Sequence, residues 1–409
     1  MTPPSPGTSG AVPRTLPVVL ALGAAQMLAW GSTYYLPAIL AGSIAADLGV
    51  SSGLVFAAFS AALVVAAILG PAIGHRIDRF GGRGVLSLSS LILAAGLTFL
   101  AAADGPAMLF AAWLVIGVGM AAGLYESAFA TLAHIYGHRA RGAITGITLL
   151  AGLASTVAWP VTAFLDAEFG WRAACLAWAA AHLLIGLPLN RLAIPRGAST
   201  STDAGHAPAI GLTGSPPRPR LAMALLALIF AVTWFISTAM AAHLPGLLQA
   251  TGASPVAAIA AAALVGPAQV AGRLVEFGLL RRMHPLLSAR LAALCHPIGG
   301  AAAIAFGAPV AAVFTILHGA GNGILTIAKG TLPLAIFGPA GYGHRQGVLM
   351  VPARFAQALA PFVFALLLER YAAWSLLLTI GLGLLALAAL LMLAAPSANG
   401  SPTGTGAAG

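Results

Sequence analysis

The stretch Gly70–Arg83, with the sequence GPAIGHRIDRFGGR, is the one place in the chain where charge is dense. It holds three arginines and one aspartate among glycines that favour a tight turn. Long apolar runs lie on both sides, and a membrane-crossing helix needs about 20 such residues. We therefore interpret the stretch as a short basic loop between two membrane helices, at one face of a lipid bilayer.

The composition of the whole chain also indicates a membrane protein. Of the 409 residues, 60% are hydrophobic and only 7% are charged, and the mean hydropathy is +0.96. A soluble domain carries about 25% charged residues, so water cannot solvate a surface this poor in charge. Strands of a membrane β-barrel alternate over segments of about 10 residues, which the long apolar runs do not match. We expect an all-α polytopic membrane protein.

The net charge of +10 does not indicate nucleic-acid binding. The basic residues are almost all arginines in short loops, without a basic stripe that carries interleaved aromatic residues. Cys175 and Cys295 each lie inside an apolar run and imply no disulfide framework. His134 and His138 have the spacing of a metal pair, but Gly137 breaks the helix between them and no acidic residue adjoins them. We expect no metal site and no cofactor.

Twelve membrane spans can be placed between the polar or Gly/Pro-rich breaks of the chain. The expected spans are residues 16–41, 53–73, 84–103, 106–134, 143–166, 171–190, 220–248, 255–280, 286–306, 309–337, 347–369 and 373–395. With the N-terminus in the cytoplasm, 14 of the 19 Lys and Arg residues lie on the cytoplasmic side, and only Arg172 and Arg370 lie on the other side. The positive-inside rule therefore predicts that both termini are cytoplasmic.

The sequence predicts two related halves. We expect six-helix bundles at residues 16–190 and 220–395, a cytoplasmic linker at 191–219, and disordered tails at 1–15 and 396–409. The segment LPAIL at 36–40 has a counterpart, LPGLL, at 244–248, and YGHR at 136–139 returns at 342–345. Such a parallel repeat places a binding site between the halves, near the middle of the bilayer.

The glycines and charges of the opening stretch resemble the signature loop of the major facilitator superfamily. A degenerate second copy is expected in the other half, and it is present. The resemblance assigns the gating loop to Gly74, Asp78, Arg79, Gly81 and Arg83 in the first copy and to Gly272, Arg273 and Glu276 in the second. With the twelve spans and the repeat, the resemblance covers the chain apart from its tails. It implies a bacterial transporter of the 12-span type, in which this loop controls conformational switching and does not bind substrate.

Asp78 is expected to act as a latch on the cytoplasmic side. It lies where a helix ends, so its carboxylate can pair with an arginine and face the start of a helix in the other half, where the helix dipole favours an anion. Arg76 is expected only to fix the topology. Arg273 and Glu276, one helical turn apart, are expected to form a local ion pair.

Ionisable residues inside the spans mark a candidate transport site, because each costs roughly 2.5–3.5 kcal/mol to insert. Glu126, on a predicted helical face with Gly119 and Gly123, is the candidate for proton coupling or substrate contact. Three roles stay open for Arg354: binding an anionic substrate, pairing with Glu126, or reaching the interface. Lys329, the only lysine, is expected to extend to the cytoplasmic interface.

Polar and aromatic stripes complete the candidate site. The resemblance implies that spans one, four, seven and ten line the cavity. The stripes comprise Gln26, Trp30, Thr33 and Tyr34 in the first span, Trp234, Ser237 and Thr238 in the seventh, His318 and Asn322 in the tenth, and Gln357 beside Arg354 in the eleventh. For each of these residues, simple helix packing is an equal alternative.

A secondary active transporter that uses alternating access is the favoured function, with a small solute and protons as partners. The intramembrane cations favour a small organic anion. Proton-driven drug efflux is the alternative, although both glycines of the superfamily's drug-antiporter motif are missing around Pro160. A membrane-embedded enzyme or a non-transporting receptor is less favoured, because no metalloprotease, Gly-x-Ser-x-Gly or Walker motif occurs. We expect a monomer in the bacterial inner membrane.

Overall fold

The structure, a computed structural model, describes residues 15–195 and 218–393. The predicted tails at 1–15 and 396–409 lie outside the described residues except at Thr15, and the predicted linker at 191–219 does so except at its two ends. Within the described ranges the chain is helical almost throughout and contains no strand. The all-α prediction is therefore confirmed.

Nine segments of the described chain are long and apolar enough to cross a membrane. Two of them, Pro106–Leu192 with 87 residues and Tyr342–Met392 with 51, are much longer than one crossing. Their helices follow one another across bends without an extended loop, so one segment takes in several helices. The multi-pass architecture is confirmed, whereas the count of twelve spans stays a prediction.

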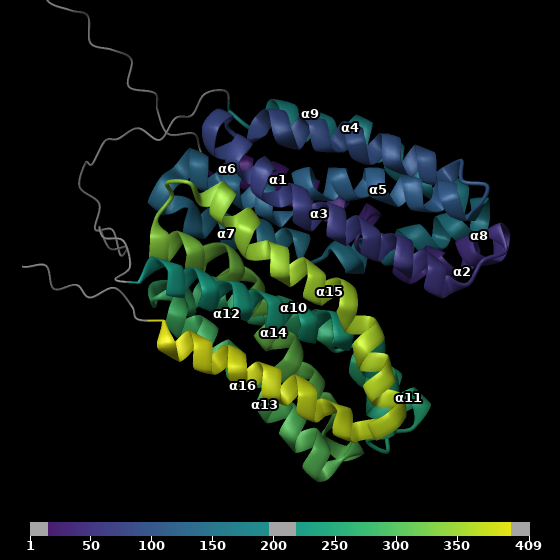
Figure 1. The fold of residues 1–409 in the computed structure, drawn as a ribbon, viewed down its shortest axis with the longest axis vertical. Helices are drawn as coiled ribbons and strands as arrows, with labels where there is room; N and C mark the ends of the chain where they lie inside the picture. The colour runs from purple at the N-terminus through teal and green to yellow at the C-terminus, as the bar shows by residue number, and fades with distance from the viewer. Residues whose placement is uncertain (1–14, 196–217, 394–409) are drawn as a thin grey trace, which may run out of the picture.

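The helices form two groups that lie side by side, one from each half of the chain (Figure 1). The first group is α1 (Thr15–Ser32), α2 (Pro37–Leu48), α3 (Ser52–Phe80), α4 (Gly82–Ala101), α5 (Pro106–Gly123), α6 (Tyr125–Tyr136), α7 (Ala140–Ala151), α8 (Ala154–Ala181) and α9 (Leu187–Leu192). The second is α10 (Pro219–Ala250), α11 (Pro255–Ala262), α12 (Val265–Gly278), α13 (Pro285–Phe306), α14 (Ala311–Phe337), α15 (Tyr342–Tyr371) and α16 (Leu376–Met392).

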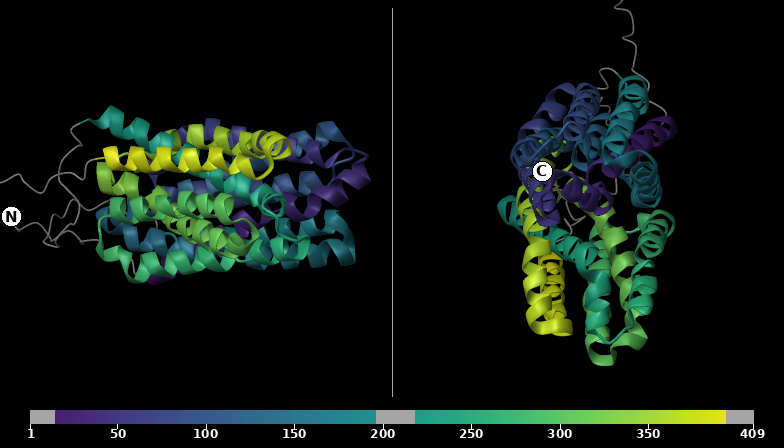
Figure 2. Two further views of the ribbon diagram at one scale, coloured as in Figure 1. Left: turned by 90° about the horizontal axis from the view of Figure 1, so that it is seen from below. Right: turned by 90° about the vertical axis from the view of Figure 1, so that its right-hand side faces the viewer.

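The helices of both groups run side by side, roughly across the long axis that is vertical in Figure 1 (Figure 2). The start of α1, the end of α9, the start of α10 and the end of α16 lie at the same end of the bundle. Large apolar side chains remain exposed around both groups, among them Ile68, Leu184, Val256, Phe362 and Leu391. An apolar outer surface of this extent requires lipid rather than water around it.

The two groups meet most closely where α3 crosses α15. Gly70 and Gly74 of α3 lie against Gly347 and Gly343 of α15, and a Cβ atom added at Gly74 would lie 1.9 Å from the Gly343 carbonyl oxygen. Only glycine allows two helix backbones to approach this closely, and membrane helices commonly use the spacing of small residues four apart for this purpose. The stretch Gly70–Arg83 therefore supplies a backbone-to-backbone contact between the halves.

Four of the predicted spans are each divided between two helices by residues outside any helix: 143–166 parts between α7 and α8, 255–280 parts between α11 and α12, and two others part beside candidate site residues. The predicted span 16–41 consists of α1 and α2, which part at Thr33–Leu36. Pro37 begins α2, where a backbone N–H would have no partner within the helix, so the N–H that proline lacks costs no hydrogen bond. The predicted span 106–134 consists of α5 and α6, which part at Leu124, where the backbone is extended at φ −84° and ψ −171°. These last two breaks lie in the first half and adjoin the candidate site residues.

Candidate functional site

Asp78 lies in the last turn of α3 and contacts the beginning of α15. Its Oδ1 accepts the backbone N–H of Gly343 at 2.7 Å, and its Oδ2 accepts the N–H of His344 at 2.8 Å. These N–H groups belong to the first turn of a helix, where they have no partner within the helix and where the helix dipole favours an anion. The carboxylate thus joins the two halves at the glycine crossing.

The rest of the first loop copy shapes the turn around this contact. Gly81 has φ +77°, a value that glycine adopts readily, and it connects α3 to α4. The guanidinium carbons of Arg76 and Arg79 lie 5.6 and 5.1 Å from the ring centre of Phe80. Arg83 lies at the start of α4. The anion contact to the other half is made by Asp78.

Replacing Asp78 by asparagine is expected to slow transport at least tenfold without loss of folded protein. A buried or half-buried charge-assisted hydrogen bond contributes about 1.5–3 kcal/mol, and the asparagine amide can accept with only one of its two terminal atoms. Uptake into proteoliposomes, normalised to the amount of monodisperse protein, measures the effect. Arg76→Gln, two residues earlier on α3, is the matched control and is expected to transport normally. Wild-type rates in Asp78→Asn would contradict the latch.

The second loop copy is arranged differently from the prediction. Glu276 of α12 pairs with Arg141 of α7, in the other half, at 3.1 Å. The same arginine donates to the carbonyl oxygen of Met283 at 2.7 Å. The predicted local pair between Arg273 and Glu276 is therefore wrong, because Glu276 is engaged across the interface. Asp78 and Glu276 thus each make one contact between the halves.

Arg273 instead points its guanidinium toward the junction of α7 and α8. A Cβ atom at Gly152 would lie 1.6 Å from its Nη1, so this junction has no room for a side chain. Arg273 is only 5% exposed. The loop motif concealed this placement, since it assigns Arg273 to gating.

The break at Leu124 determines where Glu126 lies. Carbonyl oxygens near the end of α5 lose their helical partners there, and side chains replace them: Gln26 donates to the Gly123 oxygen at 2.6 Å, and Ser127 donates to the Ala121 oxygen at 3.0 Å. Glu126 then falls in the first turn of α6, where a carboxylate is favoured by the helix dipole. Gln26 therefore supports the site through the backbone.

The predicted helical face that joins Glu126 to Gly119 and Gly123 is wrong. The two glycines belong to α5 and pack on Leu93 and Ser89 of α4, whereas Glu126 follows the break and has a new orientation. A helical spacing of three or seven residues places side chains on one face only when the helix is continuous.

Glu126 and Arg354 form an ion pair between the halves. The Nη2 of Arg354, from α15, lies 3.1 Å from both carboxylate oxygens of Glu126, from α6. Its Nη1 donates to Oε1 of Gln357 at 3.0 Å. The side chain of Arg354 is 3% exposed and that of Glu126 is 17% exposed. Of the three roles open for Arg354, the structure shows pairing with Glu126.

Lys329 is buried beside this pair and does not reach an interface. It is 5% exposed, and its Nζ lies 4.1 Å from the ring centre of Trp234. The next residue, Gly330, packs on Phe129 and Ile144 of the first half, so this part of α14 faces the interior. The predicted extension of Lys329 to the cytoplasmic interface is therefore wrong.

An aromatic cluster lies beside the Glu126–Arg354 ion pair, with the Arg354 guanidinium carbon 5.7 Å from the ring centre of Trp234. It consists of Trp30, Tyr34, Tyr35, Tyr125 and Trp234. Trp30 stacks on Trp234 with ring centres 6.2 Å apart and contacts Tyr125 at 4.9 Å. The Tyr34 hydroxyl lies 3.3 Å from the Thr238 hydroxyl of the other half. Tyr35 and Tyr125 were missed as site residues. Their signal was adjacency, since Tyr35 follows Tyr34 and Tyr125 precedes Glu126.

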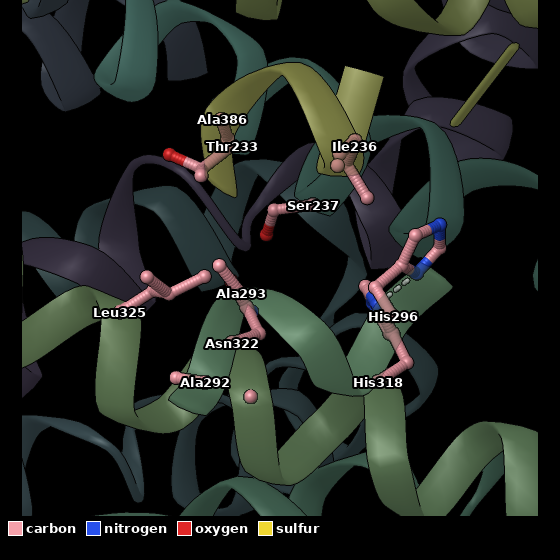
Figure 3. Close-up of a pocket in the computed structure, with 12 residues that line it drawn as sticks. Thr233, Ile236, Ser237, Ala292, Ala293, His296, His318, Asn322, Leu325 and Ala386 are labelled. Carbon is pink, nitrogen blue, oxygen red and sulfur yellow. Dashed lines mark hydrogen bonds between the residues drawn. The ribbon is translucent and has the colours of Figure 1, made fainter. Parts of the chain in front are cut away.

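The remaining predicted residues are not at the ion pair. Thr33 donates its hydroxyl to the Ala29 oxygen of its own helix. Ser237, His318 and Asn322 line a separate cavity of about 30 Å³ within the second half, between α10, α13, α14 and α16 (Figure 3). There the Nδ1 atoms of His296 and His318 lie 2.9 Å apart. Of the predicted polar stripe of α10, Trp234 and Thr238 therefore lie with the aromatic cluster, whereas Ser237 lines this cavity.

Comparisons with known proteins agree with this architecture. The sequence model described as Major Facilitator Superfamily matches residues 22–315. A protein of Thermoproteus tenax, described as an uncharacterized 38 kDa protein in the 23S RNA operon, is 31% identical over 299 residues. That match covers 72% of this chain and 66% of the relative, which is just under two thirds of the relative's own length.

Two solved structures are similar in fold. The human organic anion transporter MFSD10 (TETRAN) has a TM-score of 0.69 and 19% identity, covering 92% of this chain and 100% of its own. The proton:xylose symporter XylE, bound to 6-bromo-6-deoxy-D-glucose, has a TM-score of 0.73 and 14% identity, covering 93% and 95%. At these identities the likeness shows the fold alone.

Proposed function

Because the chain belongs to the major facilitator superfamily, whose members are membrane transporters and not enzymes, we propose that it is a proton-coupled secondary transporter of a small organic anion. It works by alternating access in the bacterial inner membrane. The observation that carries the proposal is the Glu126–Arg354 pair between the halves, with Lys329 on the same Trp234 ring as Arg354. Intramembrane ionisable groups are costly and mark transport pathways.

The surplus of positive charge favours an anionic substrate. Arg354, Lys329 and Arg273 are buried cations. Glu126 pairs with Arg354 and Glu276 pairs with Arg141, which leaves Lys329 and Arg273 without a carboxylate partner among the described residues. Removing charges from water without a counter-charge is unfavourable, so an anion stabilises this centre and a cation destabilises it. MFSD10 is described as an organic anion transporter, but at 19% identity the charges of this chain carry the argument.

The ion pair also offers a route for coupling to protons. In its ionised form Glu126 accepts hydrogen bonds from Nη2 of Arg354 with both of its carboxylate oxygens. A proton on Glu126 removes the charge that holds the pair and releases the planar donor fork of Arg354, which suits a substrate carboxylate. Proton and anion then bind together, and the contact between α6 and α15 is free to open. This sequence of events predicts symport of the anion with protons.

Two interface contacts, at Asp78 and at Arg141–Glu276, hold the same arrangement of the halves. Alternating access requires that both break when the site opens to that end of the protein. Substrate and proton therefore bind at the Glu126–Arg354 pair, and the contacts at Asp78 and Arg141–Glu276 break in the step that follows.

Replacing Glu126 by glutamine tests the coupling. In proteoliposomes with an inward proton gradient, the wild type is expected to accumulate a labelled anion above its external concentration. Glu126→Gln is expected to lose this accumulation because it has no carboxylate to take up the proton, while exchange of internal for external anion continues. Glu369→Gln, at an exposed position on α15, is the matched control. Proton-driven accumulation that persists in Glu126→Gln would exclude this residue as the coupling group.

A second candidate, efflux of a flat aromatic compound, is favoured by the aromatic cluster. Stacked and tilted rings such as Trp30 and Trp234 bind planar apolar groups. The two candidates predict different substrates: accumulation of aromatic cations in inverted vesicles supports efflux, and accumulation of organic anions in right-side-out vesicles supports uptake.

A further inference from the structure

We propose that the transported anion is an α-keto acid, with its carboxylate bound by Arg354 and its neighbouring carbonyl oxygen bound by Lys329. This inference rests on the proposed proton-coupled transport of an organic anion and specifies the class of that anion. It separates the substrate from amino acids, which carry an ammonium group at the same position. It also separates the substrate from simple carboxylic acids, which have no second oxygen acceptor there.

Trp234 of α10 brings the two cations together. The Nζ of Lys329, from α14, lies 4.1 Å from the centre of its ring, and the guanidinium carbon of Arg354, from α15, lies 5.7 Å from the same centre. An aromatic face attracts a cation but does not replace the oxygen acceptors that its N–H groups had in water. Because both cations contact one ring, neighbouring groups of one small ligand can reach both of them.

The side chains around Trp234 carry hydrogen-bond donors that are not used. Within the described part of the chain no acceptor is bound by four buried donor atoms, which are Nζ of Lys329, Nε1 of Trp234, Nε1 of Trp30 and Nε2 of Gln357. Trp30 stacks on Trp234 with ring centres 6.2 Å apart, and Gln357 accepts from Arg354 at 3.0 Å. A buried donor without an acceptor costs free energy, so this centre is suited to a ligand that supplies several oxygen atoms.

The unused acceptors beside these donors are uncharged amide oxygens. Among the described residues they are Oε1 of Gln26, one helical turn before Trp30, and Oε1 of Gln346, whose Nε2 donates to the backbone oxygen of Lys329 at 3.2 Å. A buried ammonium group needs a negative partner, which neither amide supplies, and Lys329 and Arg354 repel it. A ligand with an ammonium group beside its carboxylate is therefore disfavoured at this centre.

The charges at the centre fit one proton and one negative charge on the ligand. Before loading, Glu126 pairs with Arg354, and Lys329 has no carboxylate partner among the described residues. A proton on Glu126 frees Arg354 for the substrate carboxylate, and the charges of proton and anion cancel. Lys329 is unpaired in both states, so it binds the carbonyl oxygen without breaking an ion pair. The aromatic cluster favours a framework with a flat or apolar face.

Three acids that differ at a single carbon atom test this inference on the purified full-length protein. Phenylpyruvate has a carbonyl group beside its carboxylate, hydrocinnamate has a methylene group there, and phenylalanine has an ammonium group. Thermal unfolding is measured with each acid at one ionic strength and at one mildly acidic pH at which all three carboxylates are ionised. Phenylpyruvate is expected to bind with an apparent Kd about tenfold below that of hydrocinnamate, a difference of about 1.4 kcal/mol, and phenylalanine with a Kd about tenfold above it.

Substitutions at Lys329 separate the carbonyl contact from folding. Lys329→Met removes the charge and the donors from a side chain of similar length, so this variant is expected to bind phenylpyruvate and hydrocinnamate equally. Lys329→Arg, which keeps charge and donors, is expected to retain part of the preference. Arg370→Gln, at an exposed position on α15, is the control and is expected to show the wild-type preference. Because Lys329→Met removes a buried charge that has no carboxylate partner, it is expected to unfold at or above the wild-type temperature without ligand.

The possible outcomes distinguish this inference from the proposed function. Equal affinities of the wild type for phenylpyruvate and hydrocinnamate, or tighter binding of phenylalanine, would overturn the α-keto acid and leave a transporter of another organic anion. If Lys329→Met keeps the full preference for phenylpyruvate, Lys329 does not bind the carbonyl oxygen and the inference is wrong. If the folded wild type binds none of the three acids and does not bind pyruvate, the proposed anion transport fails with it.

Discussion

Arg354→Gln is expected to abolish transport and to lower the stability of the protein by about 3 kcal/mol. The substitution leaves the carboxylate of Glu126 without the guanidinium that contacts both of its oxygens, and breaking a buried pair from one side costs about 3–5 kcal/mol. The lower end applies because the side chain of Glu126 keeps 17% exposure. Gln357 also loses the donor that its Oε1 accepts. Thermal unfolding in detergent and uptake into proteoliposomes measure the two effects.

The double variant Glu126→Gln/Arg354→Gln distinguishes a structural role from a transport role. Two amides of similar shape hydrogen-bond to each other without a buried charge, so most of the lost stability is expected to return. Transport is not expected to return, because both the proton carrier and the planar cation are gone. A double variant that stays as unstable as Arg354→Gln would show that the two side chains do not act as a pair. Recovery of transport would show that the pair is only structural.

Gly74→Val is expected to hold the halves apart at the end where Asp78 lies and to abolish transport. A Cβ atom alone would lie 1.9 Å from the Gly343 oxygen and 2.3 Å from its carbonyl carbon. These are backbone atoms of another helix, so no side-chain rotation relieves the overlap. The helices must separate, and the hydrogen bonds from Gly343 and His344 to Asp78 are then lost.

Spin labels can measure this separation. With Cys175 and Cys295 replaced by serine, labels at Arg79 and Ala340, both exposed, report the distance between the end of α3 and the beginning of α15. Gly74→Val is expected to shift the distance distribution to longer values in the absence of ligand. Gly84→Ala is the control, because a Cβ atom there meets nothing within 4 Å. A short distance in Gly74→Val would show that the crossing tolerates a side chain.

Local sequence patterns were sufficient to locate those candidate residues whose contacts are determined by the fold that the whole family shares. The signature loop predicted that Asp78 would face the start of a helix in the other half, and the structure places it against the first turn of α15. The polar stripes indicated Trp30, Tyr34 and Trp234, which the structure brings together in the aromatic cluster. These residues could be located from the sequence because a family motif implies which helices and turns surround it. The roles of these residues remain predictions.

Predictions that depended on the partner of a charge were less successful. Helical spacing put Arg273 next to Glu276, but proximity on one helix does not decide pairing when a third charge, Arg141, approaches from another helix. A long side chain favoured an interfacial Lys329, but the helix around it is buried between the halves. Continuous hydropathy hid the extended backbone at Leu124, because a single residue with non-helical angles leaves no mark in composition.

The sequence by itself determined that this chain is an all-helical, multi-pass membrane protein of the major facilitator superfamily. The scarcity of charge, the length of the apolar runs and the loop Gly70–Arg83 are properties of the chain read in order, and they suffice because lipid admits so few backbone structures. Only the tertiary structure decided which charges meet. Glu126 and Arg354 are 228 residues apart, and their pairing depends on the break at Leu124 and on the crossing of α3 and α15. Electrostatic energy falls with distance in space, which separation along the sequence does not specify.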